Sequence, residues 1–462
     1  MQADSHSLFF DAAWLPSGWA RDVRLTVAQG RITAIETDVP MLAGETRQGW
    51  AMPGLPNLHS HAFQRAMAGL AERRGPQLAG AASDSFWTWR EAMYRFVGRM
   101  TPEDLLTIAA QAQVEMLESG FTRVGEFHYL HHDPAGQAYA DPAQMSAAVV
   151  AAAQETGIGL TLLPVLYSHS GFGGQPPSAG QARFLHDLDG FARLLDAARG
   201  HAASLPDAVV GVAPHSLRAV TLDQLAHARA LAQGAPIHIH IAEQVKEVED
   251  CLVWCGRRPV ELLLDSMAVD GQWCLVHATH MTPAETGALA ASGAVAGLCP
   301  ITEANLGDGL FPAGAFLAAG GRIGLGSDSN VRIDAAEELR LLEYGQRLVR
   351  RGRAVLAAGA GASTGETLLT ASLAGGAQAL GQPVPALVAG QVADLVSLDP
   401  GHPGLAGHQP DSAIDAWIFA GGSGAIDGVW RRGRQVVAGG RHHAREAIAR
   451  RYRATLAALR AA

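Results

Sequence analysis

The chain has 462 residues, of which 48% are hydrophobic and 17% are charged, so it can bury a large core and is not globally disordered. Its formal net charge of -9 argues against a nucleic-acid-binding protein. Lys246 is the only lysine, which excludes a lysine Schiff base at every other position.

The beginning of the chain has the pattern of short antiparallel strands. Val23–Glu36 alternates apolar and polar residues around a Gln-Gly pair, which predicts a β-hairpin. Ala393–Leu398 and Val429–Ala438 show the same alternation near the other end of the chain. We therefore predict one small β-sandwich domain that combines residues 1–50 with residues 388–445.

The middle of the chain alternates between short apolar runs and longer segments with helical spacing. The expected strands are Trp50–Leu58, Thr122–Phe127, Gly159–Tyr167, Val209–Ala213, Ile237–Ile241, Trp273–Val276, Ala294–Leu298 and Arg322–Gly326. The expected helices include Pro102–Ser119, Pro142–Glu155, Gly180–Arg199, Leu222–Ala232 and Pro283–Ser292. Hydrophobic strands that alternate with helices are typical of a parallel sheet, and eight of them close a barrel. We predict an α/β fold in which residues 51–387 form a TIM-like (β/α)8 barrel, followed by a C-terminal helix over residues 446–462.

We expect a cytoplasmic protein without a membrane segment. The N-terminal segment carries Asp4 and Asp11 and has no basic stretch ahead of an apolar one, unlike a secretory signal. Glycines and a proline interrupt the longest uncharged stretch, Thr286–Thr302, which favours a helix end, a turn and a strand over a membrane span. The four cysteines form no CxxC pair and are interpreted as reduced thiols. The Cys251 and Cys255 pair lacks the second pair that a structural metal site needs.

Metal-binding residue types follow four of the predicted strands, at the carboxyl ends where such a barrel places its active site. They are His59-Ser60-His61, the histidines and glutamate of IHIHIAE (237–243), His277 in LVHATH, and Asp328 in LGSDS. Taken singly, each could be a loop residue or a hydrogen-bonded buried polar group. Imidazoles and a carboxylate gathered at one edge have the ligand chemistry that suits zinc. The combination therefore predicts a metal site.

This set resembles the amidohydrolase superfamily, whose members are metal-dependent hydrolases on a distorted (β/α)8 barrel. Members with two metals usually bridge them with a carboxylated lysine after the fourth strand, but here that strand ends in APHSLR (213–218). The HIAE segment (240–243) instead matches the HxxE motif of the single-metal deaminase branch. The resemblance implies one divalent ion, with zinc expected. Its ligands would be His59, His61, His240 and Asp328, and the catalytic groups would be Glu243, His277 and Asp328.

Longer segments resemble one family of that branch, the formimidoylglutamate deiminases. These segments are PNLHSHAFQRAMAGL (56–70), DSFWTWREAMYR (84–95), EFHYLHHD (126–133), LPVLYSHSGFGGQPP (163–177), HSLRAV (215–220), HIHIAEQ (238–244) and TEANLGDG (302–309). The resemblance implies that a homodimer hydrolyses N-formimidoyl-L-glutamate to N-formyl-L-glutamate and ammonia in histidine degradation. It also implies substrate contacts from Gln64, Arg90, Tyr129, His215 and Arg218.

The residue types suit this reaction on physical grounds as well. A formimidoyl carbon is electrophilic, and a bound divalent ion lowers the pKa of its water toward ~7. Asp328 can accept a proton from that water, Glu243 can protonate the leaving nitrogen, and His277 can stabilise developing charge. The expected partner is a small-molecule dicarboxylate, and bidentate arginines suit its two carboxylates. Arg90 and Arg218 are the candidates. Arg90 could instead be a helix-surface arginine stacked on tryptophan, and Arg218 could be a loop arginine.

Two other functions stay open from the sequence. A deaminase of the same superfamily that acts on a nucleobase-like ring has no need of two arginine anchors, and a non-catalytic barrel is expected to have lost ligands. His131, His132 and Asp133 are interpreted as a solvated loop rather than a second metal site. Ser170–Pro177 lacks the context of a phosphate-binding loop and is expected to be a mobile loop over the pocket mouth. The loop Gly75–Ala82 has no assigned role.

Overall fold

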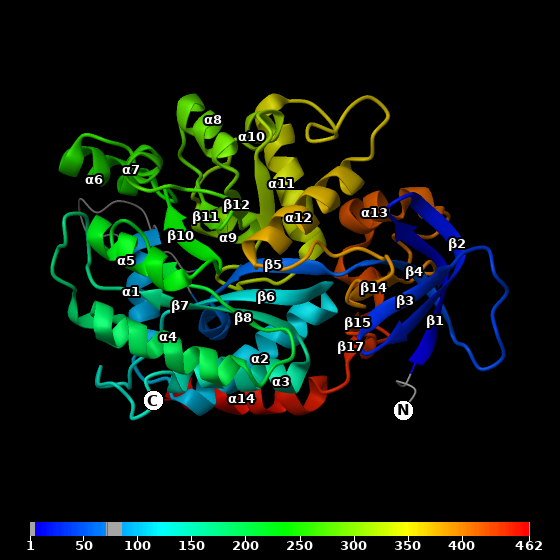
Figure 1. Ribbon diagram of the computed structural model, residues 1–462, viewed down its shortest axis with the longest axis horizontal. Helices are drawn as coiled ribbons and strands as arrows, with labels where there is room; N and C mark the ends of the chain where they lie inside the picture. Colours follow the sequence, from blue (N-terminus) through cyan, green and yellow to red (C-terminus); the bar gives the residue numbers. More distant parts are fainter. Residues whose placement is uncertain (1–4, 71, 73–85, 462) are drawn as a thin grey trace.

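The computed structural model describes residues 5–70, 72 and 86–461. It contains two large sheets that lie side by side (Figure 1). The sheet made from the two chain ends carries the blue and orange strands of the figure, and the barrel with its helices makes up most of the remainder. Among the described residues, no helix is both long and apolar enough to cross a membrane.

Both ends of the chain contribute to the first sheet. Its strands in spatial order are β17 (Arg441–His442), β16 (Arg434–Ala438), β15 (Ile426–Arg431), β14 (Leu395–Leu398), β4 (Arg47–Pro53), β1 (Ser5–Leu15), β2 (Gly18–Ala28) and β3 (Arg31–Glu36). The predicted hairpin is confirmed, because β2 and β3 pair across Gln29 and Gly30, whose φ angles of 52° and 77° suit a type I′ turn. The strands form one hydrogen-bonded series rather than the two sheets of a sandwich. Division of the chain into domains at residues 50, 388 and 445 stays a prediction.

The second sheet is the barrel. Its strands are β5 (Leu55–Ser60), β6 (Phe121–His128), β7 (Gly159–Leu166), β8 (Val209–Val210), β9 (Ala213–Pro214), β10 (Ile237–Ile241), β11 (Trp273–His277), β12 (Val295–Leu298) and β13 (Arg322–Leu325). Every neighbouring pair is parallel. The short strands β8 and β9 share the fourth position and are separated at Gly211, and a parallel bridge from Val212 to Ile237 completes the ring. The predicted α/β fold class, a distorted (β/α)8 barrel beside a β domain from both chain ends, is confirmed, but the chain ends form one sheet instead of the predicted sandwich.

Two predicted strands are wrong as single elements. Val209–Ala213 is divided between β8 and β9. Trp50–Leu58 is not continuous, because its first part belongs to β4 in the end sheet and its second part to β5 in the barrel. The chain changes sheets at Gly54, where an added Cβ would lie 2.1 Å from Thr122 Cγ2. Both parts are buried, so the apolar pattern runs through the junction without a break.

The close approach at Gly54 leads to a stability prediction. Gly54→Ala is expected to lower the free energy of unfolding by about 1–3 kcal/mol, the usual cost of overpacking a core. Gly287→Ala is the matched control, because Gly287 lies in the helix Pro283–Ser292 and an added Cβ there meets nothing within 4 Å. The control substitution should instead raise the free energy of unfolding by about 0.5–1 kcal/mol. Urea unfolding of both variants checks the pair, and equal midpoints would contradict the packing argument.

Helices surround the barrel (Figure 1). They are α1 (Phe86–Val97), α2 (Pro102–Glu118), α3 (Gln144–Thr156), α4 (Leu188–Ala202), α5 (Leu222–Ala232), α6 (Val245–Cys255), α7 (Pro259–Ser266), α8 (Pro283–Ser292), α9 (Pro300–Leu306), α10 (Ala313–Ala318), α11 (Ala335–Arg350), α12 (Thr364–Ala379), α13 (Ala413–Ala416) and α14 (Arg445–Ala461). The predicted helix Gly180–Arg199 is wrong as one element. A 3-10 turn covers Ala179–Phe184, and α4 begins after Asp187, whose side chain accepts a hydrogen bond from the Gly190 backbone at 2.7 Å.

Candidate active site

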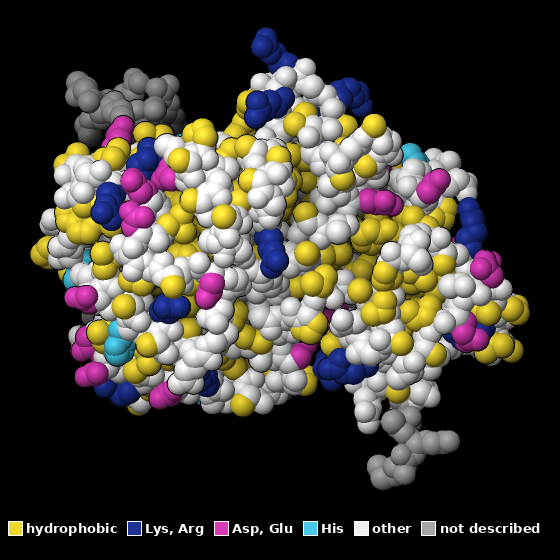
Figure 2. Space-filling view, turned by 45° about the horizontal axis from the view of Figure 1, so that its top comes forward, with side chains coloured by type: hydrophobic (Ala, Val, Ile, Leu, Met, Phe, Trp, Pro, Cys, Tyr) yellow, Lys and Arg dark blue, Asp and Glu magenta, His cyan; other side chains and the backbone are white. Residues whose placement is uncertain are grey.

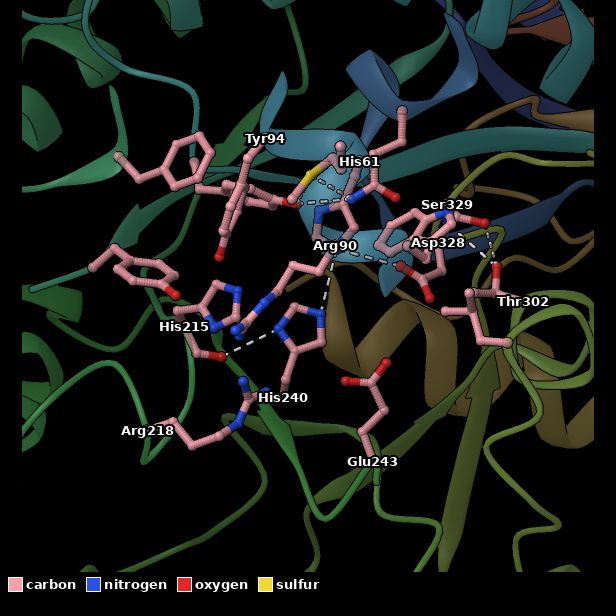
Figure 3. A pocket seen from close by; sticks show the side chains of 17 residues that line it. His61, Arg90, Tyr94, His215, Arg218, His240, Glu243, Thr302, Asp328 and Ser329 are labelled. Atoms are coloured by element: carbon pink, nitrogen blue, oxygen red, sulfur yellow. Dashed lines mark hydrogen bonds and ion pairs between the residues drawn. The ribbon is translucent and has the colours of Figure 1, made fainter. Parts of the chain in front are cut away.

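The residues predicted to bind a metal meet at the carboxyl ends of the barrel strands (Figure 3). His59 lies in β5 and His61 directly follows that strand. His240 lies in β10, and Asp328 follows β13. We call these four residues the metal cluster, and all four are buried.

The metal cluster has the spacing of a coordination site. The three imidazole Nε2 atoms lie 3.2 Å (His59–His61), 3.3 Å (His61–His240) and 3.1 Å (His240–His59) apart. The Oδ1 atom of Asp328 lies 3.5 Å and 3.3 Å from the Nε2 atoms of His59 and His61. Ligands about 2.0–2.1 Å from a tetrahedral ion are ~3.3 Å apart, so the cluster fits a divalent ion.

Backbone hydrogen bonds orient two of these imidazoles. Nδ1 of His61 lies 2.8 Å from the Phe127 carbonyl oxygen, and Nδ1 of His240 lies 3.1 Å from that of His215. Each Nδ1–H can therefore donate to a carbonyl and leave the Nε2 lone pair for a cation. Burial lowers the pKa of His61 to about 3 and that of His240 well below its ordinary value. Both imidazoles are thus neutral at pH 7, which is the form that binds metal.

A second group of acid and base side chains lies beside the cluster. His277 Nε2 is 3.7 Å from Glu243 Oε1 and 3.8 Å from Asp328 Oδ2, while its Nδ1 is 3.2 Å from Glu303 Oε1. Burial opposes the charged imidazole, but the carboxylates of Glu243, Glu303 and Asp328 outweigh it and raise the pKa of His277 to about 10. Burial also raises the pKa of Glu243 to about 7. Glu243 is therefore suited to move protons at neutral pH, whereas His277 keeps its proton there and can donate a hydrogen bond.

One further set of potential ligands, His277, Cys299 and Asp328, shares a residue with the cluster. Burial raises the pKa of the Cys299 thiol well above its ordinary value, so the thiol is protonated and binds metal poorly. His277 is already held by Glu303. The cluster of three histidines and Asp328 is the better site for a cation.

A pocket opens over the metal cluster and encloses about 530 Å³, its open mouth included. All five residues predicted to contact substrate line it, namely Gln64, Arg90, Tyr129, His215 and Arg218. The side-chain amide of Gln64 donates to the Tyr129 hydroxyl at 2.8 Å, and its Oε1 is buried without a hydrogen-bond partner among the described residues. Arg218 Nε lies 3.7 Å from Glu247 Oε2, and the guanidinium of Arg90 lies 5.7 Å from the ring centre of Tyr94. Both arginines point into the pocket (Figure 3).

Sequence reasoning missed several residues of this site. Glu303, which holds His277, lies in the first turn of α9, and Glu247, which faces Arg218, lies in α6. Tyr94, Tyr167, Phe184, Thr302 and Ser329 also line the pocket. The segments DSFWTWREAMYR, LPVLYSHSGFGGQPP and TEANLGDG contain four of these residues and were the available signal.

Some expectations outside the site are wrong. His131 is not solvated but buried, and its Nε2 lies 3.0 Å from the Val165 carbonyl oxygen. Ser170–Pro177 supplies none of the described residues that line the pocket, and its Phe172 stacks on Trp254 of α6 with ring centres 5.7 Å apart. The loop Gly75–Ala82 lies outside the described residues.

Comparison with known proteins identifies the class. The model of the amidohydrolase family matches residues 50–436, so the chain belongs to the amidohydrolase family. A second model, the N-terminal domain of formimidoylglutamate deiminase HutF, matches residues 6–49. Formimidoylglutamate deiminase from Pseudomonas aeruginosa is 53% identical over 448 residues, which cover 96% of this chain and 98% of the relative. Within its family the chain therefore groups with the formimidoylglutamate deiminases.

A solved structure agrees with membership of the amidohydrolase family. A crystal structure of an amidohydrolase from Brucella melitensis superimposes with a TM-score of 0.94 at 52% identity and covers 98% of this chain and 99% of its own. A more distant relative, 5-methylthioadenosine/S-adenosylhomocysteine deaminase from Natronomonas pharaonis, is 28% identical over 81% of each chain.

Proposed function

We propose that this protein hydrolyses N-formimidoyl-L-glutamate to N-formyl-L-glutamate and ammonia, a step of histidine degradation. The 53% identity to a formimidoylglutamate deiminase along almost the whole chain carries this conclusion. The site supports it independently, because two arginines line a pocket beside a cluster that fits a metal ion. Arginine is the residue best suited to hold the carboxylates of such a substrate.

The metal cluster would hold a zinc ion, with His59, His61, His240 and Asp328 as ligands. Bound there, the ion would supply hydroxide at neutral pH, because a divalent ion lowers the pKa of its bound water. Asp328 is the proposed acceptor of the water proton, because its carboxylate lies at the boundary between the cluster and His277. Catalytic zinc sites typically have histidine and carboxylate ligands and keep a coordination position open.

Glu243 and His277 are the proposed proton carrier and charge stabiliser. Hydrolysis transfers both water hydrogens to the imino nitrogen, which leaves as ammonia, and the water oxygen becomes the formyl oxygen. Glu243, with its pKa raised by burial to about 7, can deliver a proton to that nitrogen. His277, held by Glu303, can donate a hydrogen bond to the oxygen on which negative charge develops.

The remaining pocket residues would bind the amino-acid part of the substrate. Arg90 and Arg218 are the proposed partners of the two carboxylates, and His215 lies beside His240 in the pocket wall (Figure 3). The free Oε1 of Gln64 is placed to accept a hydrogen bond from a substrate N–H, while Tyr129 fixes the Gln64 amide.

The metal content provides one test. We expect one tightly bound ion per chain, most abundantly zinc, because one set of four ligands fits and Lys246, the only lysine, lies in α6 outside the pocket. Elemental analysis, before and after removal of the metal with a chelator and reconstitution, measures the number of bound ions per chain. A Cys299→Ser variant is the control and should keep the ion. Two stoichiometric ions, each required for turnover, would contradict the single-metal assignment.

Ammonia release from a substrate panel tests the function itself. The panel contains formimidoylglutamate, formimidoylaspartate, cytosine, guanine and adenosine. The three ring compounds test the alternative of a nucleobase-like substrate, since a relative at 28% identity is a 5-methylthioadenosine/S-adenosylhomocysteine deaminase. We expect turnover of the formimidoyl amino acids and none of the ring compounds. Preferred turnover of a ring would replace the proposed function with that of a nucleobase deaminase.

We also propose a cytoplasmic homodimer that binds no nucleic acid. All four cysteines are free, in keeping with a reducing compartment. Leu252, Val253 and Trp254 expose apolar side chains together on α6, which supports self-association. On the face shown in Figure 2, Lys and Arg side chains lie in separate places among acidic ones rather than in one basic patch. Light scattering after size-exclusion chromatography measures the oligomeric state.

A further inference from the structure

Two tyrosines that line the pocket, Tyr94 and Tyr167, share a buried hydrogen-bond partner behind them, Gln181. Tyr94 lies in α1, Tyr167 follows β7, and Gln181 lies in the 3-10 turn Ala179–Phe184. Tyr167 is 4% exposed and Gln181 is 1% exposed. We call these three residues the tyrosine–glutamine triad.

The triad lies one residue layer farther from the metal cluster than His215. The ring centre of His215 is 4.9 Å from that of His240, and the ring centre of Tyr167 is 4.6 Å from that of His215. The ring centre of Tyr94 lies 5.7 Å from that of Phe184, which also lines the pocket. A substrate whose formimidoyl carbon sits at the cluster therefore meets the triad with its far end.

A capping interaction fixes the direction of the hydrogen bonds in the triad. Oε1 of Gln181 accepts hydrogen bonds from the Ser178 backbone N–H at 2.7 Å and from its hydroxyl at 3.2 Å. The amide nitrogen of Gln181 must therefore face the tyrosines, and it donates to the Tyr167 hydroxyl at 2.7 Å and to the Tyr94 hydroxyl at 3.5 Å. Both phenolic oxygens act as acceptors toward Gln181, so their hydrogens point elsewhere.

The hydroxyl hydrogens of Tyr94 and Tyr167 are available to a ligand, because both hydroxyl oxygens accept from the Gln181 amide and neither hydrogen is directed at it. Burial keeps the pKa of Tyr94 well above its ordinary value, so its hydroxyl stays protonated. Arg90 and Arg218 line the same pocket and can only donate. These donors suit a carboxylate, because a carboxylate carries negative charge and only accepts hydrogen bonds.

We propose that the tyrosine–glutamine triad binds the side-chain carboxylate of the substrate and selects a side chain of glutamate length. The inference rests on the proposed function and extends it to the choice of substrate. Five bonds separate the formimidoyl carbon from the side-chain carboxylate carbon of a glutamate derivative, whereas three separate it from the α-carboxylate carbon. An aspartate derivative is one methylene shorter, about 1.3 Å along the chain. It therefore leaves the triad without its partner.

Conservative variants of the triad test the proposal with two substrates. Tyr167→Phe removes one hydroxyl and keeps the ring, whereas Gln181→Glu keeps the Ser178 contacts and removes the amide donor. For formimidoylglutamate we expect KM to rise about 10- to 100-fold with kcat within threefold, the scale of a hydrogen bond to a charged group. For the side-chain amide, formimidoylglutamine, we expect wild type and variants to differ by less than threefold. The preference of wild type for formimidoylglutamate over formimidoylaspartate should shrink in both variants.

Tyr344→Phe is the matched control, because Tyr344 is 37% exposed on α11 and does not line the pocket. This variant should leave kcat and KM unchanged for every substrate. Equal losses on the acid and the amide, or no loss on either, would overturn the role of the triad while the proposed function stands. If Gln181→Glu fails to fold, Tyr167→Phe decides the result. A wild-type enzyme that releases no ammonia from formimidoylglutamate would overturn the proposed function and this inference with it.

Discussion

Replacing Glu243 by glutamine is expected to lower turnover by at least ~100-fold while the protein keeps its metal. Glu243 is buried and lies 3.7 Å from His277, but it does not belong to the metal cluster. Glutamine has nearly the same shape and cannot carry the proton that the leaving nitrogen needs. Steady-state ammonia release and metal content should therefore change independently in this variant.

Asp328→Asn is the informative comparison. It removes a ligand charge as well as the proposed proton acceptor, so turnover and metal content should fall together. Glu249→Gln on the exposed side of α6 serves as the control and should leave both unchanged. A Glu243→Gln enzyme with near-normal turnover would remove Glu243 from the mechanism.

The metal cluster could be predicted because each ligand depends on local sequence. His59 lies in β5 and His61 directly follows that strand, with Ser60 between them, so strand periodicity directs both side chains to the same side. His240 and Asp328 follow the same rule at the ends of their own strands, and a parallel barrel brings all carboxyl ends to one face. Eight apolar runs were therefore enough to predict that these residues meet.

The supporting residues could not be predicted, because their partners lie on other elements. Glu303 reaches His277 from α9, and Glu247 reaches Arg218 from α6. Helical spacing shows which face of a helix is polar but not which strand residue it meets. The break at Gly54 was missed for a related reason, since hydrophobicity does not record that a buried chain moves from one sheet to another.

The two arginines are the proposed physical basis for binding a glutamate derivative, and Arg90→Met or Arg218→Met is expected to lower kcat/KM for formimidoylglutamate by roughly 30- to several-thousand-fold. Loss of one partner from a desolvated charge pair costs about 2–5 kcal/mol, and each ~1.4 kcal/mol is tenfold. The protein has a net charge of -9, so only a local positive field can attract a dianion. Lysine should restore activity only in part, because an ammonium group lacks the bidentate geometry of a guanidinium.

The Arg218 variant needs a control for the buried Glu247, whose Oε2 lies 3.7 Å from Arg218 Nε. Arg218→Met leaves that carboxylate without its cation, and the double variant Arg218→Met with Glu247→Gln removes the charge. If substrate binding causes the loss, the double variant stays impaired on formimidoylglutamate. Each arginine variant should also match wild type on the mono-amide that lacks the carboxylate it binds. Wild-type kcat/KM on the full substrate in both arginine variants would show that the arginines are structural, and the glutamate-derivative substrate would lose its physical support.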